Sequence, residues 1–280
     1  MIELRNLTKD FDGFTAVDHL SLTVDTNEFF GLLGPNGAGK TTTISMISTV
    51  LLPTEGQVLI DGKPLTRAAS AEKRKLSVIT QEYSMRQDMT IDEVMEYQGR
   101  LYFMKRKDIR RKTDELLEFT GLADCRKRIV RHLSGGMKRK VMICRALMTD
   151  PEILLLDEPT AGMDALARRQ MWNLLRQLHR ANNLTIILTT HYIDEAQSLC
   201  NRVALLDSGK LDTVDTPQNL IEELGAFAVD EVTDDRVVST YYRRRADAIA
   251  HLEGLGDDAT LRNTTLEDVF VERVGKRLGN

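Results

Sequence analysis

The sequence has few cysteines and no long apolar run. Its three cysteines, Cys125, Cys144 and Cys200, are odd in number and lack metal-ligand spacing, so buried and reduced thiols are expected. No stretch approaches the roughly 20 apolar residues that a membrane-crossing helix needs. The N-terminus, Met1-Ile2-Glu3, has neither the basic region nor the apolar region of a secretory signal peptide. Together these absences predict a cytosolic protein.

The composition is that of an ordinary globular chain, with 42% hydrophobic and 29% charged residues among 280. This length suits one large domain, or a large domain and a small one. A net charge of −4 and a pI near 5.8 argue against a general nucleic-acid binder. The charge is uneven, because residues 105–145 hold 14 Lys or Arg against 5 acids. Either this segment is the solvated side of amphipathic helices, or it faces phosphates or an anionic membrane.

Alternating strands and helices dominate the pattern. Short β-rich runs predict strands at residues 2–6, 19–24, 28–33, 57–60, 76–80, 153–156, 185–189 and 202–206. Helices are expected from about Lys40, over residues 165–181 and over 192–199. Between Thr90, an expected N-cap, and Met148 the pattern is helical. We therefore expect βαβ units, a largely parallel sheet, and a helical insertion at about residues 86–150.

The character of the chain changes after residue 224. Residues 226–232 and 236–242 predict a hairpin, and residues 244–255 predict a helix. A final helix is expected to open with a capping box, in which Thr264 is the cap and Glu267 reaches back to it. Residues 1–224 are thus predicted to form the main domain, and residues 225–280 a small α+β accessory region.

A glycine-rich loop joins an expected strand to the helix near Lys40. It matches the pattern G-x-x-x-x-G-K-[ST] through Gly34, Pro35, Asn36, Gly37, Ala38, Gly39, Lys40 and Thr41, with Thr42 following. The glycines let backbone N–H groups curl around phosphates, and the helix N-terminus adds its positive dipole end. Lys40 is expected to reach the β- and γ-phosphates, and the Thr41 hydroxyl to bind Mg²⁺. The alternative, a chance glycine-rich turn, is disfavoured by the strand and helix on either side.

Two acids, Asp157 and Glu158, end the apolar strand expected at residues 153–156. Buried strands often end in acids, so this signal is weak alone. It becomes strong beside a phosphate loop, because a second metal ligand must emerge at the same edge of the sheet. Asp157 suits the Mg²⁺ shell, and Glu158 is placed to polarise the attacking water, a role worth ~10²–10⁴-fold in rate. The pattern predicts hydrolysis of a nucleoside triphosphate.

Between these motifs lie Leu133, Ser134, Gly135 and Gly136, a serine cap with two glycines that presents N–H groups at a helix N-terminus. The order of phosphate loop, Gln81, this segment, Asp157-Glu158 and His191 resembles the nucleotide-binding domain of ABC transporters. The motifs span residues 11–191, and the general resemblance extends to about residue 224. It implies an α/β fold with a P-loop NTPase core, a mixed sheet and a helical subdomain.

The resemblance also implies roles for single residues. Phe11 stands where the family places an aromatic that stacks on adenine, and Gln81 matches a glutamine that touches Mg²⁺ and senses the transmembrane partner. Residues 133–136 match the signature loop, which binds the γ-phosphate held by the opposite subunit. Asp164 matches the dimer-contacting loop, although Ala161 and Met163 stand where Ser and Leu are more usual. His191 matches the histidine that contacts the γ-phosphate.

Two further segments, residues 189–196 and 265–270, resemble the ATPases of ABC-2-type exporters. This resemblance implies a separate ABC-2-type membrane permease, a second ATP-binding subunit in a homodimer, ATP and Mg²⁺ as cofactors, and a peripheral place on the cytoplasmic side of the plasma (inner) membrane. The tail could instead be a capped helix that merely packs on its own domain. The ATPase of an ABC importer and a soluble ABC ATPase outside transport are the alternatives.

Overall fold

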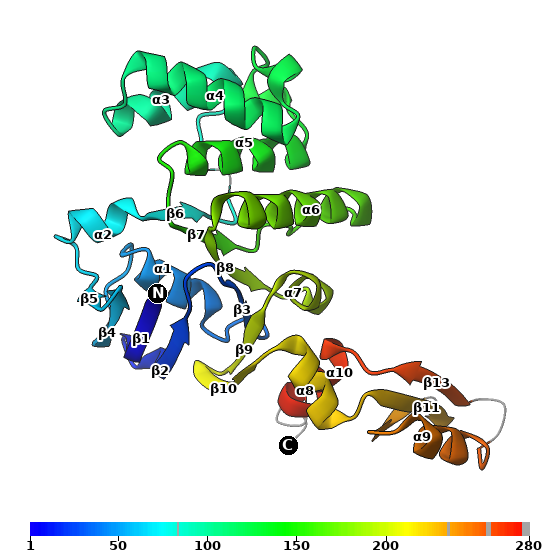
Figure 1. Ribbon diagram of the computed structural model, residues 1–280. Helices are drawn as coiled ribbons and strands as arrows, with labels where there is room; N and C mark the ends of the chain where they lie inside the picture. Colours follow the sequence, from blue (N-terminus) through cyan, green and yellow to red (C-terminus); the bar gives the residue numbers. More distant parts are fainter. Residues whose placement is uncertain (83, 234–235, 256–258, 276–280) are drawn as a thin grey trace.

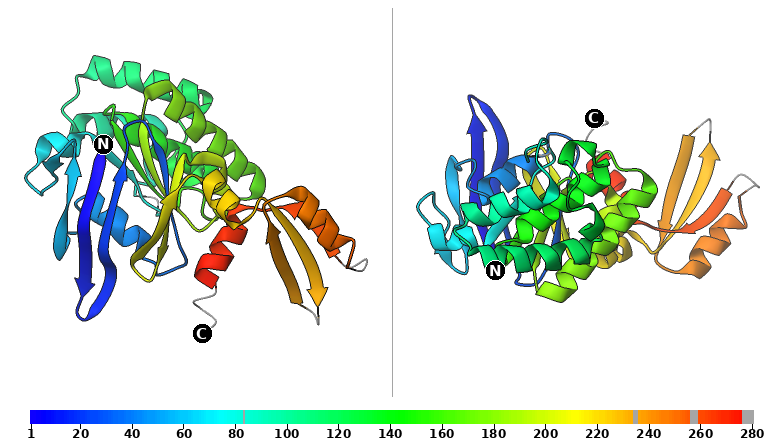
Figure 2. Two further views of the ribbon diagram at one scale, coloured as in Figure 1. Left: turned by 60° about the horizontal axis from the view of Figure 1, so that its bottom comes forward. Right: turned by 90° about the horizontal axis from the view of Figure 1, so that it is seen from above.

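Three sheets organise the chain (Figure 1). The computed structural model describes residues 1–82, 84–233, 236–255 and 259–275. Within these residues the strand orders are β2-β1-β4-β5, β10-β9-β3-β8-β7-β6 and β12-β11-β13. The second sheet is the centre of the molecule, and the other two flank it (Figures 1 and 2).

The first sheet is antiparallel and comes mostly from the N-terminal segment. Its strands are β1 (Ile2–Phe11), β2 (Phe14–Val24), β4 (Glu55–Ile60) and β5 (Lys63–Pro64). The turn between β1 and β2 is Asp12-Gly13, with φ of 44° and 94°, as a two-residue hairpin turn of type I′ requires. This turn pairs Phe11 with Phe14 across the hairpin.

The central sheet is mixed, which confirms the predicted fold class. The parallel strands are β3 (Phe29–Leu33), β6 (Leu76–Ile79), β7 (Ile153–Asp157), β8 (Thr185–Thr190) and β9 (Arg202–Asp207). An unpredicted strand, β10 (Lys210–Asp215), pairs antiparallel with β9 at one edge. The strands expected from the sequence are all present, and most are longer than predicted, because hydrogen-bonded pairing extends past the apolar run at their ends.

Strand alternation divides the interior into two cores. In β7 the side chains of Ile153 and Leu155 join a core with the first sheet and α1 (Lys40–Ile47), while Leu154 and Leu156 face the opposite core. Successive side chains of a strand point to opposite faces, and both faces are covered here. Such a strand is apolar throughout, so its sequence shows no alternation.

Helices pack in layers over the second face of the central sheet, with two of them outside the others (Figure 1). They are α3 (Ile91–Leu101), α4 (Arg106–Thr120), α5 (Gly135–Leu147), α6 (Ala165–Asn182) and α7 (Ile193–Leu199), with a short α2 (Ser70–Arg74) elsewhere. Thr90 caps α3 as predicted: its hydroxyl accepts from the Glu93 N–H at 3.3 Å, and Glu93 accepts from the Thr90 N–H at 2.7 Å. The predicted helical insertion is α3 to α5.

The C-terminal segment begins with α8 (Pro217–Leu224) and then forms the third sheet. That sheet holds β11 (Phe227–Thr233), β12 (Arg236–Tyr242) and β13 (Ala259–Asn263), with α9 (Arg245–Leu252) against it and α10 (Leu266–Phe270) after it. Figure 2 shows the sheet standing to one side of the core. The hairpin and α9 confirm the prediction, whereas β13 was not predicted. The domain division at residue 224 stays a prediction. The last five residues of the predicted accessory region, 276–280, lie outside the described part.

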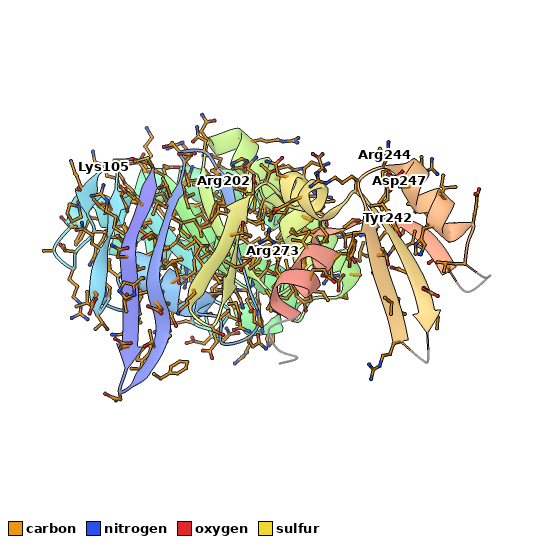
Figure 3. The ribbon with its side chains drawn as sticks, turned by 90° about the horizontal axis from the view of Figure 1, so that it is seen from below. Lys105, Arg202, Tyr242, Arg244, Asp247 and Arg273 are labelled. Carbon is orange, nitrogen blue, oxygen red and sulfur yellow. The ribbon has the colours of Figure 1, made fainter. Side chains whose placement is uncertain are left out.

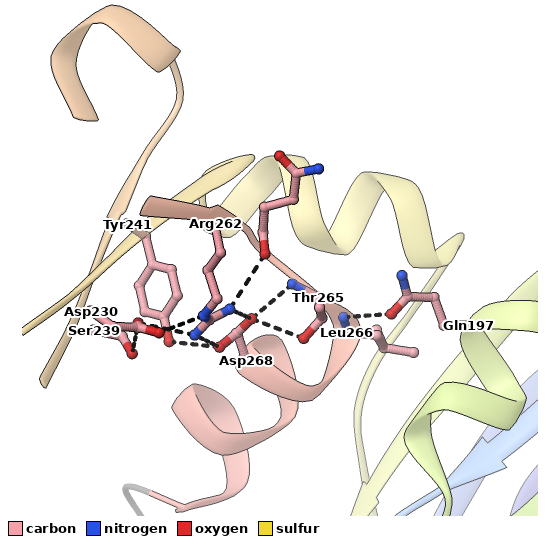
Figure 4. A network of polar contacts seen from close by, with 9 residues as sticks. Gln197, Asp230, Ser239, Tyr241, Arg262, Thr265, Leu266 and Asp268 are labelled. Atoms are coloured by element: carbon pink, nitrogen blue, oxygen red, sulfur yellow. Dashed lines mark hydrogen bonds and ion pairs between the residues drawn. The ribbon is translucent and has the colours of Figure 1, made fainter. Parts of the chain in front are cut away.

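The predicted capping box at Thr264 is wrong by one residue. Helix α10 starts at Leu266, and Thr265 donates from its N–H and its hydroxyl to Asp268 at 2.8 and 2.9 Å. Thr264 is buried, and its N–H donates to the Ala226 carbonyl at 3.0 Å, so it continues the strand. Asp268 is fixed in turn by Arg262, at 2.7 Å to each carboxylate oxygen (Figure 4). The sequence pattern does not reveal that Arg262 binds Asp268.

The three cysteines are free: Cys144 and Cys200 are buried, but Cys125 is only half-buried. Burial raises the pKa of the Cys144 thiol to about 11, and a hydrogen bond with Thr120 offsets this only in part. The prediction of buried thiols therefore holds for two of the three. In the part of the chain that the structure describes, no helix combines the length and apolar character needed to cross a bilayer.

Candidate functional site

The predicted phosphate loop follows the buried strand β3 and leads into α1, which begins at Lys40. Gly39 caps this helix in the left-handed region, with φ of 92°. A Cβ on Gly39 would lie 2.5 Å from the Ala16 carbonyl oxygen, and one on Gly34 would lie 2.4 Å from that of Leu206. No larger residue fits at either position. The close packing of the loop explains both glycines.

Lys40 is held against the loop. Its Nζ donates to the carbonyl oxygens of Gly34 and Pro35 at 2.8 and 3.0 Å, and the residue is buried. Burial lowers the pKa of Lys40, while the negative charges of Glu158 and Asp157 oppose that shift. An ammonium group so held lacks full hydration, and phosphate oxygens would therefore be stronger partners for it than the two carbonyls.

Asp157, at the end of β7, lies beside the start of α1. Its Oδ1 accepts hydrogen bonds from the Thr41 hydroxyl at 3.1 Å and the Thr189 hydroxyl at 2.5 Å. Gln81 lines the cavity that Thr41 also lines. This set of oxygen donors fits Mg²⁺, which takes one or two protein ligands together with substrate phosphates and waters. These are the three residues predicted to bind Mg²⁺, and that role stays a prediction.

Glu158 has an unusual backbone, with φ of 47°, a region that non-glycine residues rarely adopt. Its N–H donates to both the carbonyl and the hydroxyl of Thr189, each at 3.1 Å. These bonds hold the turn after β7. The Glu158 Oε2 lies 3.1 Å from His191 Nδ1, and the carboxylate side chain is 14% exposed against 41% for the imidazole. The two groups thus meet where β7 and β8 end.

A cavity of about 540 Å³ brings most of the predicted site together. It is lined by Phe11, Phe14, Ala16, Asn36, Gly37, Gly39, Lys40, Thr41, Thr42, Gln81, Glu158 and His191. The predicted residues Gly34, Pro35, Ala38 and Asp157 shape or support the loop without lining the cavity. The aromatic rings of Phe11 and Phe14 lie at the open side, with exposures of 44% and 63%.

The remaining predicted residues do not line this cavity. Leu133, Ser134, Gly135, Gly136 and Asp164 belong to the starts of two helices. The Ser134 hydroxyl accepts from the Met137 N–H at 3.3 Å, which confirms the predicted cap of α5. Asp164 caps α6 by accepting from the Ala167 N–H at 2.8 Å. Ser134 and Gly135 are exposed at the surface.

Two contacts of the site were missed in the sequence. Phe14 lies opposite Phe11 in the hairpin, and the Asp-Gly turn between them is a signal that could have paired them. Thr189 lies in register with Asp157 on the neighbouring strand. Its position could be found only by aligning the two strands, which the sequence leaves open.

A buried polar network behind the site was also missed. Glu195, on α7, is fully buried, and its Oε1 accepts from the Thr160 hydroxyl at 2.8 Å and from Trp172 Nε1 at 2.9 Å. Thr160 follows Glu158 by two residues, and Glu195 follows His191 by four. The network therefore ties together the segments that carry Glu158 and His191.

Comparison with known proteins agrees with this geometry. The family described as ABC transporter matches residues 17–161. A Nod factor export ATP-binding protein I of Cupriavidus metallidurans is 34% identical over 99% of this chain and 98% of its own length. The linearmycin resistance ATP-binding protein LnrL of Bacillus subtilis is 34% identical over 83% of this chain and 75% of its own length.

Solved structures show the same relationship. The ATP-binding subunit of an ABC transporter has a TM-score of 0.70 and 26% identity, over 80% of this chain and 92% of that one. An ATP-binding cassette solved as a dimer in a post-hydrolysis state with ADP and Pi has a TM-score of 0.68 and 27% identity, over 77% and 98%. The chain therefore belongs to the ABC transporter family, and it is an ATP-binding, ATP-hydrolysing subunit of a transporter.

Proposed function

We propose that this subunit drives an ABC-2-type export system as one half of a head-to-tail homodimer. The observation that carries the proposal is the separation within one chain of two parts of the predicted site. The cavity contains Lys40, Glu158 and His191, while the exposed signature segment at Ser134 lies outside its lining. A second copy, related by a two-fold axis, would bring its own Ser134 to this cavity and complete two equivalent sites.

In the proposed site each group has a distinct task. The loop N–H groups and Lys40 bind the β- and γ-phosphates. Thr41, Gln81 and Asp157 would hold Mg²⁺, which neutralises charge on the phosphate oxygens. Glu158 accepts a proton from the attacking water. His191, whose Nδ1 lies 3.1 Å from the Glu158 carboxylate, orients that carboxylate toward the γ-phosphate. Phe11 and Phe14 provide apolar faces for the adenine.

ATP favours the closed pair because only the closed pair makes contacts from both chains to one γ-phosphate. Hydrolysis removes those contacts, and the pair opens. A membrane permease would couple this cycle to transport, with the ATPase subunits peripheral on the cytoplasmic side. Export is favoured over import because the named relatives include an export protein and a resistance protein. The resemblance of residues 265–270 to the ATPases of ABC-2-type exporters also favours export.

The permease partnership can be tested by copurification. The tagged chain is isolated from detergent-solubilised membranes, and bound proteins are identified by mass. We expect an integral membrane protein in stoichiometric amount, retained through a second column. Recovery of ribosomal or DNA-bound complexes without a membrane protein would contradict the transport assignment and support the soluble alternative.

A further inference from the structure

The turn between α3 and α4 exposes an unusual group of apolar side chains. Leu101, Tyr102 and Phe103 are consecutive, and they are 53%, 47% and 91% exposed. Tyr97, one turn earlier on α3, is 50% exposed. Both helices lie in the outermost layer of the molecule, beyond α5 (Figure 1). We call residues 97–111 the α3–α4 tip.

The backbone of the tip has a conformation that suits glycine. Phe103 has φ of 58°. Its N–H donates to the carbonyl oxygen of Arg100, and the N–H of Met104 donates to that of Gly99, each at 3.0 Å. Helix α4 ends with the same pair of bonds, but there Gly121 takes the left-handed position, with φ of 68°. A bulky residue in this region is a strained exception. Packing does not offset that strain at Phe103, because the ring lies in solvent.

The charges next to this turn are also locally unfavourable. Residues 100–111 contain six Lys or Arg and one acid, Asp108. Lys105, Arg106 and Lys107 cap and begin α4, where the helix dipole favours negative groups. These three and Arg110 are exposed, and no ion pair joins any of them to another described residue. The tip therefore combines exposed aromatic rings with uncompensated cations at a cost to local stability.

We propose that the α3–α4 tip binds the surface of an anionic lipid bilayer directly. Aromatic rings are favoured at the boundary between headgroups and acyl chains, and clustered cations are attracted to the lipid phosphates. Lys105, Arg106 and Lys107 are consecutive and exposed at the start of α4, where the backbone changes from extended to helical, so their long side chains diverge. Such a spread fits a broad anionic surface better than one acidic pocket on a protein. The contact would orient the helical layer toward the membrane independently of the permease.

The test measures binding of the full chain to lipid vesicles by cosedimentation. One set contains phosphatidylcholine alone, and the other contains phosphatidylcholine with phosphatidylglycerol. The wild-type chain should sediment with the anionic vesicles only, and high salt should release it. Combined Lys105→Glu, Arg106→Glu and Lys107→Glu should weaken binding by about 100-fold. These acids suit the start of α4, so the variant should fold.

Two further variants separate the tip from general charge and from misfolding. Combined Arg243→Glu, Arg244→Glu and Arg245→Glu makes the same charge change in the C-terminal region, at the opposite end of the molecule from Lys105 (Figure 3). This control should bind vesicles like the wild type. Phe103→Gly relieves the backbone strain, so it should keep or raise the melting temperature while weakening vesicle binding.

The outcomes decide the proposal without reference to export, because the vesicles contain no protein. Equal loss of binding in the tip and control triple variants would overturn it, since net charge alone would explain both. Failure of the wild-type chain to bind anionic vesicles would also overturn it. If the wild-type chain does not bind vesicles and the Lys105, Arg106 and Lys107 triple variant loses a copurifying membrane protein, the tip is a protein contact. Binding of a fluorescent ATP analogue should be unchanged in all variants.

Discussion

The buried carboxyl of Glu195 gives a prediction whose magnitude follows from the structure. Glu195→Ala removes the acceptor shared by Thr160 and Trp172 and leaves two buried donors without a partner. Each unsatisfied group costs about 1–3 kcal/mol, so the free energy of unfolding should fall by roughly 2–6 kcal/mol. A domain is stable by only about 5–15 kcal/mol in total. The variant should therefore be close to unfolding.

Glu195→Gln keeps the volume and the carbonyl acceptor, so its cost should stay below about 1.5 kcal/mol. The pH dependence of the free energy of unfolding distinguishes the protonated from the ionised form of the Glu195 carboxyl in the wild type. Burial raises its pKa above the usual 4.5, and hydrogen bonds, including those from Thr160 and Trp172, offset this only in part. The folded chain then holds a proton that the unfolded chain releases. This contribution to stability is complete below pH 4.5 and is lost as the pH rises through the folded pKa.

Urea unfolding of the three proteins between pH 5 and 8 measures both effects. Relative to the wild type, the Gln variant should gain stability as the pH rises, because it lacks the titrating proton. Glu118→Gln and Glu118→Ala are matched controls at an exposed position of α4, and both should change stability by less than about 0.5 kcal/mol. An Ala variant as stable as the Gln variant would refute the reasoning about the two buried donors.

Three further outcomes are expected. Lys40→Ala should abolish ATP turnover and weaken nucleotide binding, measured by phosphate release and a fluorescent analogue; wild-type turnover would reduce the loop to a structural turn. Mixing Lys40→Ala chains with Ser134→Arg chains should restore some turnover, since one site of the mixed dimer is intact; no recovery at any ratio would argue against shared sites. Arg262→Ala leaves Asp230 and Asp268 without their cation, and partial exposure limits the loss to about 1–3 kcal/mol. Burial works to raise the pKa of Asp268, but hydrogen bonds from Arg262 and Thr265 lower it below the usual 3.8. The stability lost in Arg262→Ala should therefore be full above pH 3.8 and shrink as the pH falls through the folded pKa. Denaturation at about pH 3 and pH 7 measures this difference.

The sequence predicted those parts of the site that depend on short contiguous patterns. The loop from Gly34 to Thr41 and the acids at the end of β7 are each specified by residues within one segment, and strand and helix periodicity places them at one edge of the sheet. The caps at Thr90 and Ser134 are equally local, because each bonds a residue three positions later. Local chemistry of this kind is visible without a structure.

The parts that were missed depend on contacts between distant segments. Thr189 reaches Asp157 from 32 residues away, and Trp172 reaches Glu195 from 23. The cap of α10 moved from Thr264 to Thr265 because the backbone of Thr264 continues a strand pairing. Strand β13 pairs with β11 across a sequence gap that includes β12 and α9. Sequence pattern gives each segment its type, whereas register and tertiary pairing decide which side chains meet.

In the proposed function, two copies of the chain share each ATP site and Glu158 activates the water. Glu158→Gln keeps the size of the side chain but removes the charge that polarises water and repels the γ-phosphate.

Size exclusion with light scattering, with and without Mg-ATP, tests this claim beside a phosphate-release assay. We predict that the Glu158→Gln variant retains ATP, hydrolyses it ~10²-fold or more slowly, and forms a dimer of the 31.7 kDa chain only with ATP. Lys40→Ala should stay monomeric in the same conditions. Near-normal turnover in the Glu158→Gln variant, with no ATP-dependent dimer, would mean that Glu158 is not the base and that the shared-site dimer does not form.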